Sequence, residues 1–422
     1  MKLTQAQFRR AAYFSGNFGL AKLSIYFAPL AMASFALPET YAGMELAFAL
    51  APFIALVLGS PFLSAVPQLY LVRGEKRVFD LGAGVAAAAA SLMTFAGIAL
   101  LFAGEAIPAM ACFAAACVSV QGAASTLTRT LSRRNIAAWA DGMAALAMFL
   151  AAGAAWFVFG SWFDAGDAAI TWAIVSLVLA MVAMLLFRRW REPGLRARLA
   201  AAWQIGLPMV INGLFGMVIG SGGRIAFGAF AQPWDLSAYA IGFRIAGLML
   251  GLHQLMITAF FARVYAARTR AFDRTAPLYL LAVAGGGVLL CLASPFLLPH
   301  LGFKALTADR QGALLDWLPL IALQVYLWIG FATLELRINR ARMARRLILP
   351  NLAVTAAGVA GFIWLESTGL ASPANIVAFM AVVTALFVAI QIAMLWRRGL
   401  VLPRTATSLA AGAVPFLILA LA

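Results

Sequence analysis

The run FRRWREPGLRARLAAAW, from Phe187 to Trp203, divides the chain. It carries five arginines and a Pro-Gly pair, whereas the apolar stretches on either side, near 168–187 and 204–229, hold few charges. About 20 apolar residues in a helix cross a bilayer core of about 30 Å. Because short cytoplasmic loops retain Lys and Arg, the run is predicted to join two membrane spans on the cytoplasmic side.

Outward from this run, basic clusters recur in every second connection and hold 26 of the 31 lysines and arginines. The intervening connections carry acids, such as Glu105, Asp164 and Asp309. This alternation predicts twelve spans, with the N-terminus and the connection after the twelfth span in the cytoplasm. The spans are predicted near 13–36, 44–70, 80–102, 107–127, 139–160, 168–187, 204–229, 236–262, 276–298, 314–336, 347–366 and 373–396.

Composition favours the same class of protein. The chain is 64% hydrophobic and 11% charged, with a mean hydropathy of +0.95. Its net charge of +16 lies in the loops, which predicts contact with anionic lipid head groups and not with nucleic acid. Cys112, Cys117 and Cys291 lie in apolar stretches, so no disulfide or metal site is expected. The first span is too long for a cleavable signal, and we expect a multi-pass protein of the bacterial inner membrane.

The long basic connection predicts an all-α protein of two six-helix lobes around a central cavity. The N-terminal lobe is expected over 1–199 and the C-terminal lobe over 200–404. The remaining residues, 405–422, end in the apolar run SLAAGAVPFLILALA, which is too short to span comfortably. Two readings stay open for this tail: a helix on the membrane surface, or the start of a thirteenth span.

Motifs for catalysis are missing from the sequence. It has no HExxH, no P-loop and no Ser/His/Asp order, and its only histidines are His253 and His300. The outer loops are short and leave little room for catalytic groups. We therefore expect a protein that is not an enzyme and that uses no cofactor. Transport is the usual role of twelve spans in two halves.

Three cations lie inside apolar stretches, where a charge is costly and needs a reason. Arg244, Lys22 and Arg224 are accordingly predicted to bind substrate in a cationic cavity. The alternatives are snorkelling to head groups, for Lys22 and Arg224, or pairing with an acid, for Lys22. The predicted polar lining of the cavity could equally form hydrogen bonds between helices; its residues are Tyr26, Asn212, Gln254, Gln324 and Tyr326.

Acids separate the substrate classes. A cation-coupled drug antiporter needs a carboxylate deep in the bundle, but the sequence places Glu45 near an outer end and Asp141 and Glu335 near inner ends. A cavity with cations and no central acid suits an anion, and arginine grips phosphate through two parallel hydrogen bonds. A suitable substrate would offer phosphate groups for the cations, polar groups for the amides and an apolar tail that remains in lipid.

The segment from Ile205 to Ala266 resembles the start of the second half of polysaccharide flippases. These belong to the multidrug/oligosaccharidyl-lipid/polysaccharide exporter superfamily. The stretch from Pro38 to Gly59 resembles the beginning of their second span. One departure is that the aspartate expected before the arginine of span seven is Gly223 here. The matching residues of spans seven and eight are Gly206, Leu207, Pro208, Arg224, Gly228, Tyr239, Arg244 and Ile245.

This resemblance implies a flippase that moves a polyprenyl-diphosphate-linked oligosaccharide to the outer leaflet by alternating access, for O-antigen, capsule or exopolysaccharide assembly. Its partners would be membrane lipids, a polysaccharide polymerase and the chain-length machinery. One alternative is a drug or small-metabolite exporter on the same scaffold. Another is a membrane scaffold or enzyme subunit with no transport of its own.

Overall fold

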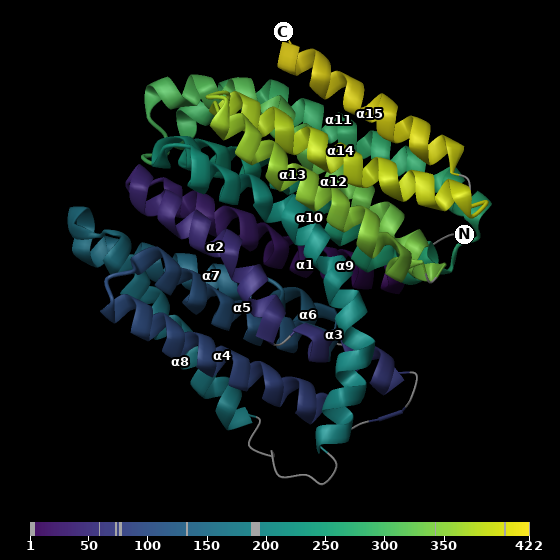
Figure 1. Ribbon diagram of the computed structural model, residues 1–422, viewed down its shortest axis with the longest axis horizontal. Coiled ribbons are helices and arrows are strands. Elements are labelled where there is room, and N and C mark those ends of the chain that lie inside the picture. Colours follow the sequence, from purple (N-terminus) through teal and green to yellow (C-terminus); the bar gives the residue numbers. More distant parts are fainter. Residues whose placement is uncertain are drawn as a thin grey trace. The chain divides into compact units, whose positions relative to one another are not determined.

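The computed structural model describes residues 5–58, 60–71, 74–75, 78–131, 134–186, 195–341, 343–400 and 402–421. The chain is 90% helical, and the described ranges contain no strand. It divides into two compact units, Met1–Ile211 (unit 1) and Asn212–Ala422 (unit 2). Figure 1 shows α9, Leu195–Phe230, running from one unit into the other. The predicted all-α fold is confirmed.

Ten of the described helices are long and apolar enough to cross a membrane. A helix satisfies all of its own backbone hydrogen bonds, which the lipid interior requires because it holds no water to do so. Lipid-facing positions also explain the many large apolar side chains that are exposed, such as Phe102 and Phe157. The structure therefore supports the predicted multi-pass membrane protein.

Unit 1 is built around α5, which packs against α2, α3, α4, α6 and α8. The predicted span 44–70 corresponds to two helices, α2 and α3, that are described separately. The predicted span 139–160 is divided, because α6 ends at Ala140 and α7 begins at Met143. The helices wholly within unit 1 are α1 Gln5–Ala33, α2 Pro38–Leu58, α3 Ser60–Leu71, α4 Val78–Phe102, α5 Ala106–Thr130, α6 Arg134–Ala140, α7 Met143–Phe159 and α8 Ala165–Leu186, with a 3-10 turn at Gly160–Trp162.

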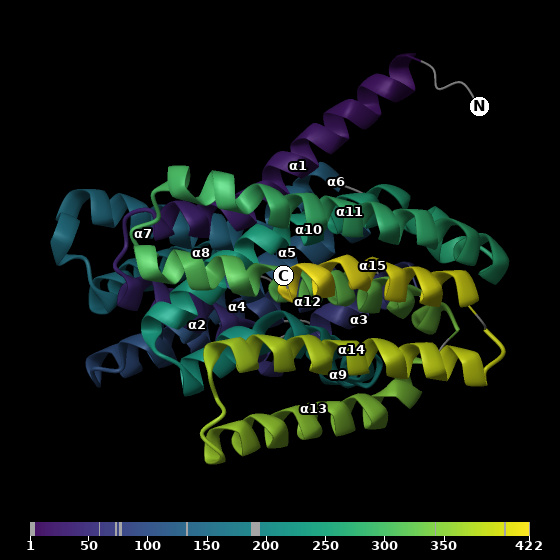
Figure 2. The same ribbon diagram turned by 90° about the horizontal axis from the view of Figure 1, so that it is seen from above.

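Unit 2 has α10 and α12 at its centre. In the apolar spans of these two helices 89% and 83% of the residues are buried, against 22% for α13. Figure 2 shows α13 at the edge of the unit, beside α14. Its helices after α9 are α10 Pro233–Ala266, α11 Thr269–Leu301, α12 Ala308–Arg340, α13 Ala344–Ser367, α14 Pro373–Arg397 and α15 Pro403–Leu421.

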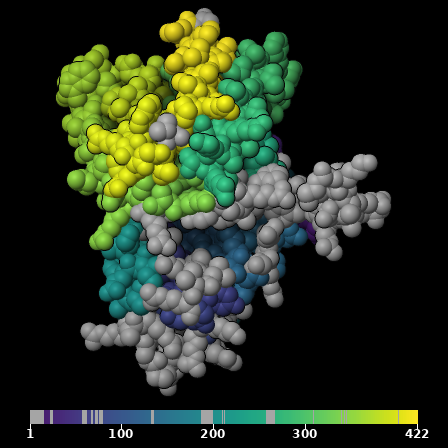
Figure 3. All heavy atoms as spheres, turned by 90° about the vertical axis from the view of Figure 1, so that its right-hand side faces the viewer, coloured from purple at the N-terminus to yellow at the C-terminus, as the bar shows by residue number. Residues whose placement is uncertain are grey.

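The C-terminal tail forms α15, a helix of 19 residues that is apolar enough to cross a membrane. It packs along α11 and α12 (Figures 1 and 3). The Asp273 carboxylate of α11 accepts hydrogen bonds from the Thr405 backbone N–H and hydroxyl, both at 2.8 Å. The Tyr326 hydroxyl donates to the Ser408 carbonyl at 3.0 Å. Of the two readings left open for the tail, the structure favours a thirteenth membrane helix.

Candidate functional site

Two of the three predicted cations are buried in unit 2. Arg224 in α9 is 7% exposed and Arg244 in α10 is 5% exposed. Arg244 lies 11 residues, or about 16 Å of helix, from the start of α10. The Arg224 guanidinium lies 5.4 Å from the ring centroid of Phe243, the residue next to Arg244, and donates to the Gly220 carbonyl at 3.4 Å. Both arginines therefore belong to one region of α9 and α10.

A hydrogen-bonded tyrosine lies beside this region. Tyr239 stacks on Phe227 with ring centroids 4.5 Å apart, and its hydroxyl donates to Gln324 at 3.0 Å. A Cβ atom at Gly223 would lie 2.0 Å from that hydroxyl oxygen. The ring can hardly retreat, because stacking and the hydrogen bond hold it. The structure thus explains the departure at Gly223: the Tyr239 hydroxyl occupies the space that an aspartate would need.

Two residues of the predicted polar lining hold helices together. Gln324 of α12 also donates to the Ile219 carbonyl of α9 at 3.0 Å, and Tyr326 binds α15. Both are fully buried. This is the alternative role that the sequence left open for them. Tyr26 is buried in α1, and Gln254 has a buried amide oxygen; the side chains of Lys22 and Asn212 lie outside the described residues.

His253 of α10 makes its hydrogen bond to a different helix from those around the two arginines. Its ring nitrogen Nδ1 forms a hydrogen bond with the Tyr279 hydroxyl of α11. This contact agrees with its expected direction, nearly opposite Arg244 around α10, and with a role in helix packing. Any effect of replacing His253 should therefore be an effect on the contact between α10 and α11.

The buried acids of the described chain each bind a protein group. Glu45 lies two turns into α2, is fully buried, and accepts from the Tyr41 hydroxyl at 3.1 Å. Asp235 pairs with Arg310 at 2.6 Å, and Asp273 caps α15. The sequence placed Glu45 near a helix end, and its complete burial was missed because its position within α2 depends on where that helix begins.

Sequence reasoning also missed two buried amides, Asn351 of α13 and Gln391 of α14. Neither is more than 1% exposed. Within the described chain, the oxygen of Asn351 and both polar atoms of Gln391 have no hydrogen-bond partner. Single amides in apolar helices are common, and nothing in the local sequence distinguishes these two from Gln324. The structure distinguishes Asn351 and Gln391 because their buried polar atoms have no hydrogen-bond partner within the described chain.

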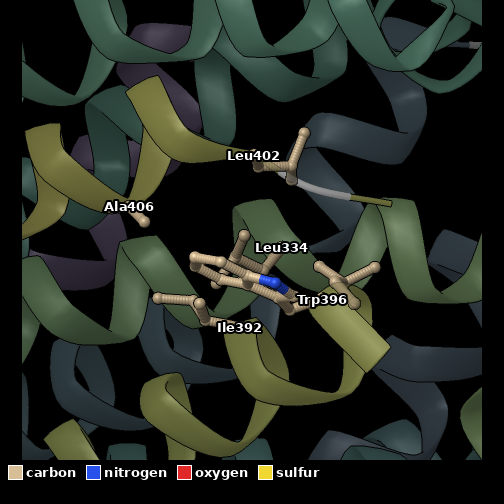
Figure 4. Close-up of a pocket in the computed structure, with 6 residues that line it drawn as sticks. Leu334, Ile392, Trp396, Leu402 and Ala406 are labelled. Carbon is tan, nitrogen blue, oxygen red and sulfur yellow. The ribbon is translucent and has the colours of Figure 1, made fainter. Parts of the chain in front are cut away.

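A small pocket lies where α12, α14 and α15 meet (Figure 4). Its lining is apolar apart from the indole nitrogen of Trp396, and neither Arg224 nor Arg244 contributes to it. The pocket therefore does not correspond to the predicted cationic cavity. The lining residues are Leu334, Ile392, Leu395, Trp396, Leu402 and Ala406.

No family model matches the sequence, and no curated protein matches it. Several solved structures share its fold. The lipid II flippase MurJ in an inward closed conformation covers 97% of this chain and 97% of its own, with 12% identity and a TM-score of 0.66. A multidrug resistance MATE family transporter of the MOP superfamily, outward-facing, covers 97% and 99%, with 14% identity and a TM-score of 0.53.

A second MATE structure, in a straight conformation, covers 94% of this chain and 96% of its own, at 14% identity and a TM-score of 0.51. These neighbours are described as flippases and transporters. At such low identity they show a shared architecture only. They do not identify the residues of this chain that would contact a substrate. The chain has the fold of the MurJ flippase and of the MATE transporters.

Proposed function

We propose that this protein is an inner-membrane flippase that moves a polyprenyl-diphosphate-linked oligosaccharide to the outer leaflet by alternating access. The observation that carries the proposal is the burial of Arg224 and Arg244 in two neighbouring membrane helices. Placing one arginine at the centre of a membrane helix costs about 2.5–3.5 kcal/mol on insertion scales. Two buried arginines in one region of unit 2 imply a use that offsets a cost of this kind.

The chemistry of arginine supports an anionic substrate. Its planar guanidinium donates two parallel hydrogen bonds to a phosphate, and it keeps its charge when buried. Asp235, the buried acid at the start of α10, is already paired with Arg310. A diphosphate carries enough negative charge to meet both arginines, while its polyprenyl tail can stay in the bilayer.

The shared fold supports alternating access. MurJ, described as a lipid II flippase, and the MATE transporters, described in inward-facing and outward-facing conformations, have the same architecture. In such proteins the two halves expose a site near mid-membrane to each side in turn. We extend the proposal to a cytoplasmic N-terminus, and to a polysaccharide polymerase and chain-length machinery as the consumers of the exported glycan.

The test is a flipping assay with the full chain in liposomes. The probe is a fluorescent polyprenyl-diphosphate-linked disaccharide, and a membrane-impermeant quencher reports the fraction that reaches the opposite leaflet. We expect Arg244→Ala to abolish flipping and Arg244→Lys to restore only part of it, because lysine keeps the charge but loses the paired donors. Arg346→Ala, which removes an exposed cation, is the matched control and should flip normally.

His253→Ala should retain most of the activity, since its contact is with Tyr279. Full activity of Arg244→Gln, at normal protein abundance, would contradict the proposal that Arg244 of α10 binds the substrate.

The alternative favoured by the MATE likeness is export of a drug or small metabolite. It would be indicated if the wild-type protein moved no diphosphate-linked probe but lowered the accumulation of a cationic dye in cells, with Glu45→Gln abolishing that effect.

A further inference from the structure

The fifth predicted span contains a break that the proposed function does not use. α6 ends at Ala140, α7 begins at Met143, and Asp141 and Gly142 form a turn between them. α7 alone has 17 residues, about 25 Å of helix, so the span needs α6 to cross a core of about 30 Å. The turn thus interrupts the helix near one end of the span.

One face of α5 holds the two sides of this break. The Gln121 amide nitrogen donates to the Asp141 carbonyl at 2.7 Å, and its oxygen accepts from the Ala144 backbone N–H at 3.1 Å. A single side chain therefore satisfies a carbonyl left open at the end of α6 and an N–H left open at the start of α7. Backbone breaks survive at membrane depth only when other groups satisfy them in this way.

Two more residues of α5 reach the same turn. Ser125 and Arg129 both bind the Asp141 carboxylate. Gln121, Ser125 and Arg129 are spaced four residues apart and so share one face of α5. These bonds join α5 to the turn and to the first turn of α7. Beyond Ala144, α7 packs chiefly on α1 and α8, and the Trp172 indole of α8 donates to the Met148 carbonyl at 3.1 Å. The polar contacts with α5 fix one point of the span, and the direction of α7 beyond it depends on packing and on the single hydrogen bond from Trp172.

We infer that the Asp141–Gly142 turn is a hinge about which α7 changes its direction relative to α6, with Gln121 as its pivot. Sharp bends in helices occur where the ladder of backbone hydrogen bonds is interrupted, and a few residues at the end of an element absorb the dihedral change. Because α1 packs along both α6 and α7, such a bend also moves the surface on which α1 rests. α1 contains Lys22 and Tyr26, two of the residues that the sequence predicts for the cavity.

Gly142 has φ −109° and ψ −14°, a conformation that any residue adopts. Gly142→Ala therefore favours a continuous helix and should stiffen the hinge. Gln121→Leu removes both bridging hydrogen bonds and should loosen it. Without these two bonds, the population in which α7 departs from its present direction should rise by roughly tenfold or more. The two variants are expected to change the range of α7 directions in opposite senses, and the test uses both.

The experiment measures a distance between spin labels in the full chain in nanodiscs, with the three native cysteines replaced. Labels at Phe157 of α7 and Phe102 of α4, both exposed, report the direction of α7. Labels at Phe102 and Ile170 of α8 are the control pair, because α4 and α8 pack together. We expect the Phe102–Phe157 distribution to narrow in Gly142→Ala and to broaden or gain a second maximum in Gln121→Leu, with the control pair unchanged.

Identical Phe102–Phe157 distributions in the wild type and both variants would overturn the hinge and make the turn a fixed kink. Equal changes in both pairs would also overturn it, since the movement would then lie elsewhere in unit 1. Neither result depends on the substrate, so the hinge and the flippase proposal stand or fall separately.

Discussion

The Tyr239 hydroxyl shows how a single residue can decide which neighbours are possible. It lies 3.0 Å from the Gln324 amide oxygen and occupies the space beside Gly223, where a Cβ atom would be 2.0 Å away. Glycine is therefore required at 223 for as long as Tyr239 keeps its place. An aspartate cannot be introduced at 223 without moving an aromatic ring that is stacked and hydrogen-bonded.

We predict that Gly223→Ala lowers the stability of the protein by about 1–3 kcal/mol, the usual cost of overpacking. The measurement is thermal unfolding in detergent. Gly216→Ala, on the same helix but with no atom within 4 Å of the added methyl group, is the matched control. Adding Tyr239→Leu should make Gly223→Ala less costly than it is alone. Equal melting temperatures for the two alanine variants would contradict the close approach.

At the residue scale, the sequence predicted the importance of the buried arginines but not the roles of the polar lining residues. An arginine in an apolar stretch stands out because burying its charge in a membrane costs free energy. Arg224 and Arg244 are both buried in the structure. Whether a polar side chain lines a cavity or joins two helices depends on its partner, which is distant in the chain: Gln324 donates to the Ile219 carbonyl, and Tyr326 donates to the Ser408 carbonyl. The assignment of any of these residues to a substrate site stays a prediction.

At the scale of elements, α15 is attached to unit 2 by its first turn. Asp273 of α11 accepts hydrogen bonds from Thr405, and a carboxylate at a helix N-terminus also faces the positive end of the helix dipole. Further along, Leu409 packs where a Cβ at Gly330 of α12 would stand, 2.5 Å away. The helix is thus held by a polar cap at one end and close apolar packing beyond it.

Removing the cap should loosen α15. For Asp273→Ala we expect a loss of about 1–3 kcal/mol, because buried donors lose their acceptor. Trypsin should then cut after the exposed Arg404 faster than in the wild type. Asp309→Ala, which removes an exposed carboxylate, should leave both quantities unchanged. An unaltered cleavage rate in Asp273→Ala would show that packing alone holds the helix.

Helix positions followed from sequence wherever hydropathy and charge agreed. The break at Asp141 was not predicted. The apolar run of the span 139–160 is typical of one continuous helix, and Asp141 lies so near its end that it could be taken for a loop residue. The tail was also ambiguous: its apolar run is short, and the Asp273 carboxylate that caps the start of α15 lies far away in sequence.

At the scale of the whole molecule, the alternation of basic and acidic connections makes a topology that can be tested. With the native cysteines replaced, single cysteines at Asp164 and Asp309 should react with an impermeant reagent in intact cells. Cysteines at Arg133 and Arg342, which lie outside the described residues, should react only after the cells are opened. If α15 crosses as the thirteenth span, a cysteine at Leu421 should react from outside. Outside labelling at all positions would overturn the cytoplasmic N-terminus.

The cap on α15 also has a consequence for synthesis. Asp273 precedes Thr405 by 132 residues. At about 5–20 residues per second, a ribosome makes that length in roughly 7–26 s. Throughout this interval α11 has been made but the Asp273 carboxylate lacks its contacts with α15, and Gly330 of α12 lacks its contact with Leu409. A chain cut short before residue 403 would carry this exposed acid permanently, which gives a membrane quality-control protease a chemical difference between unfinished and finished copies.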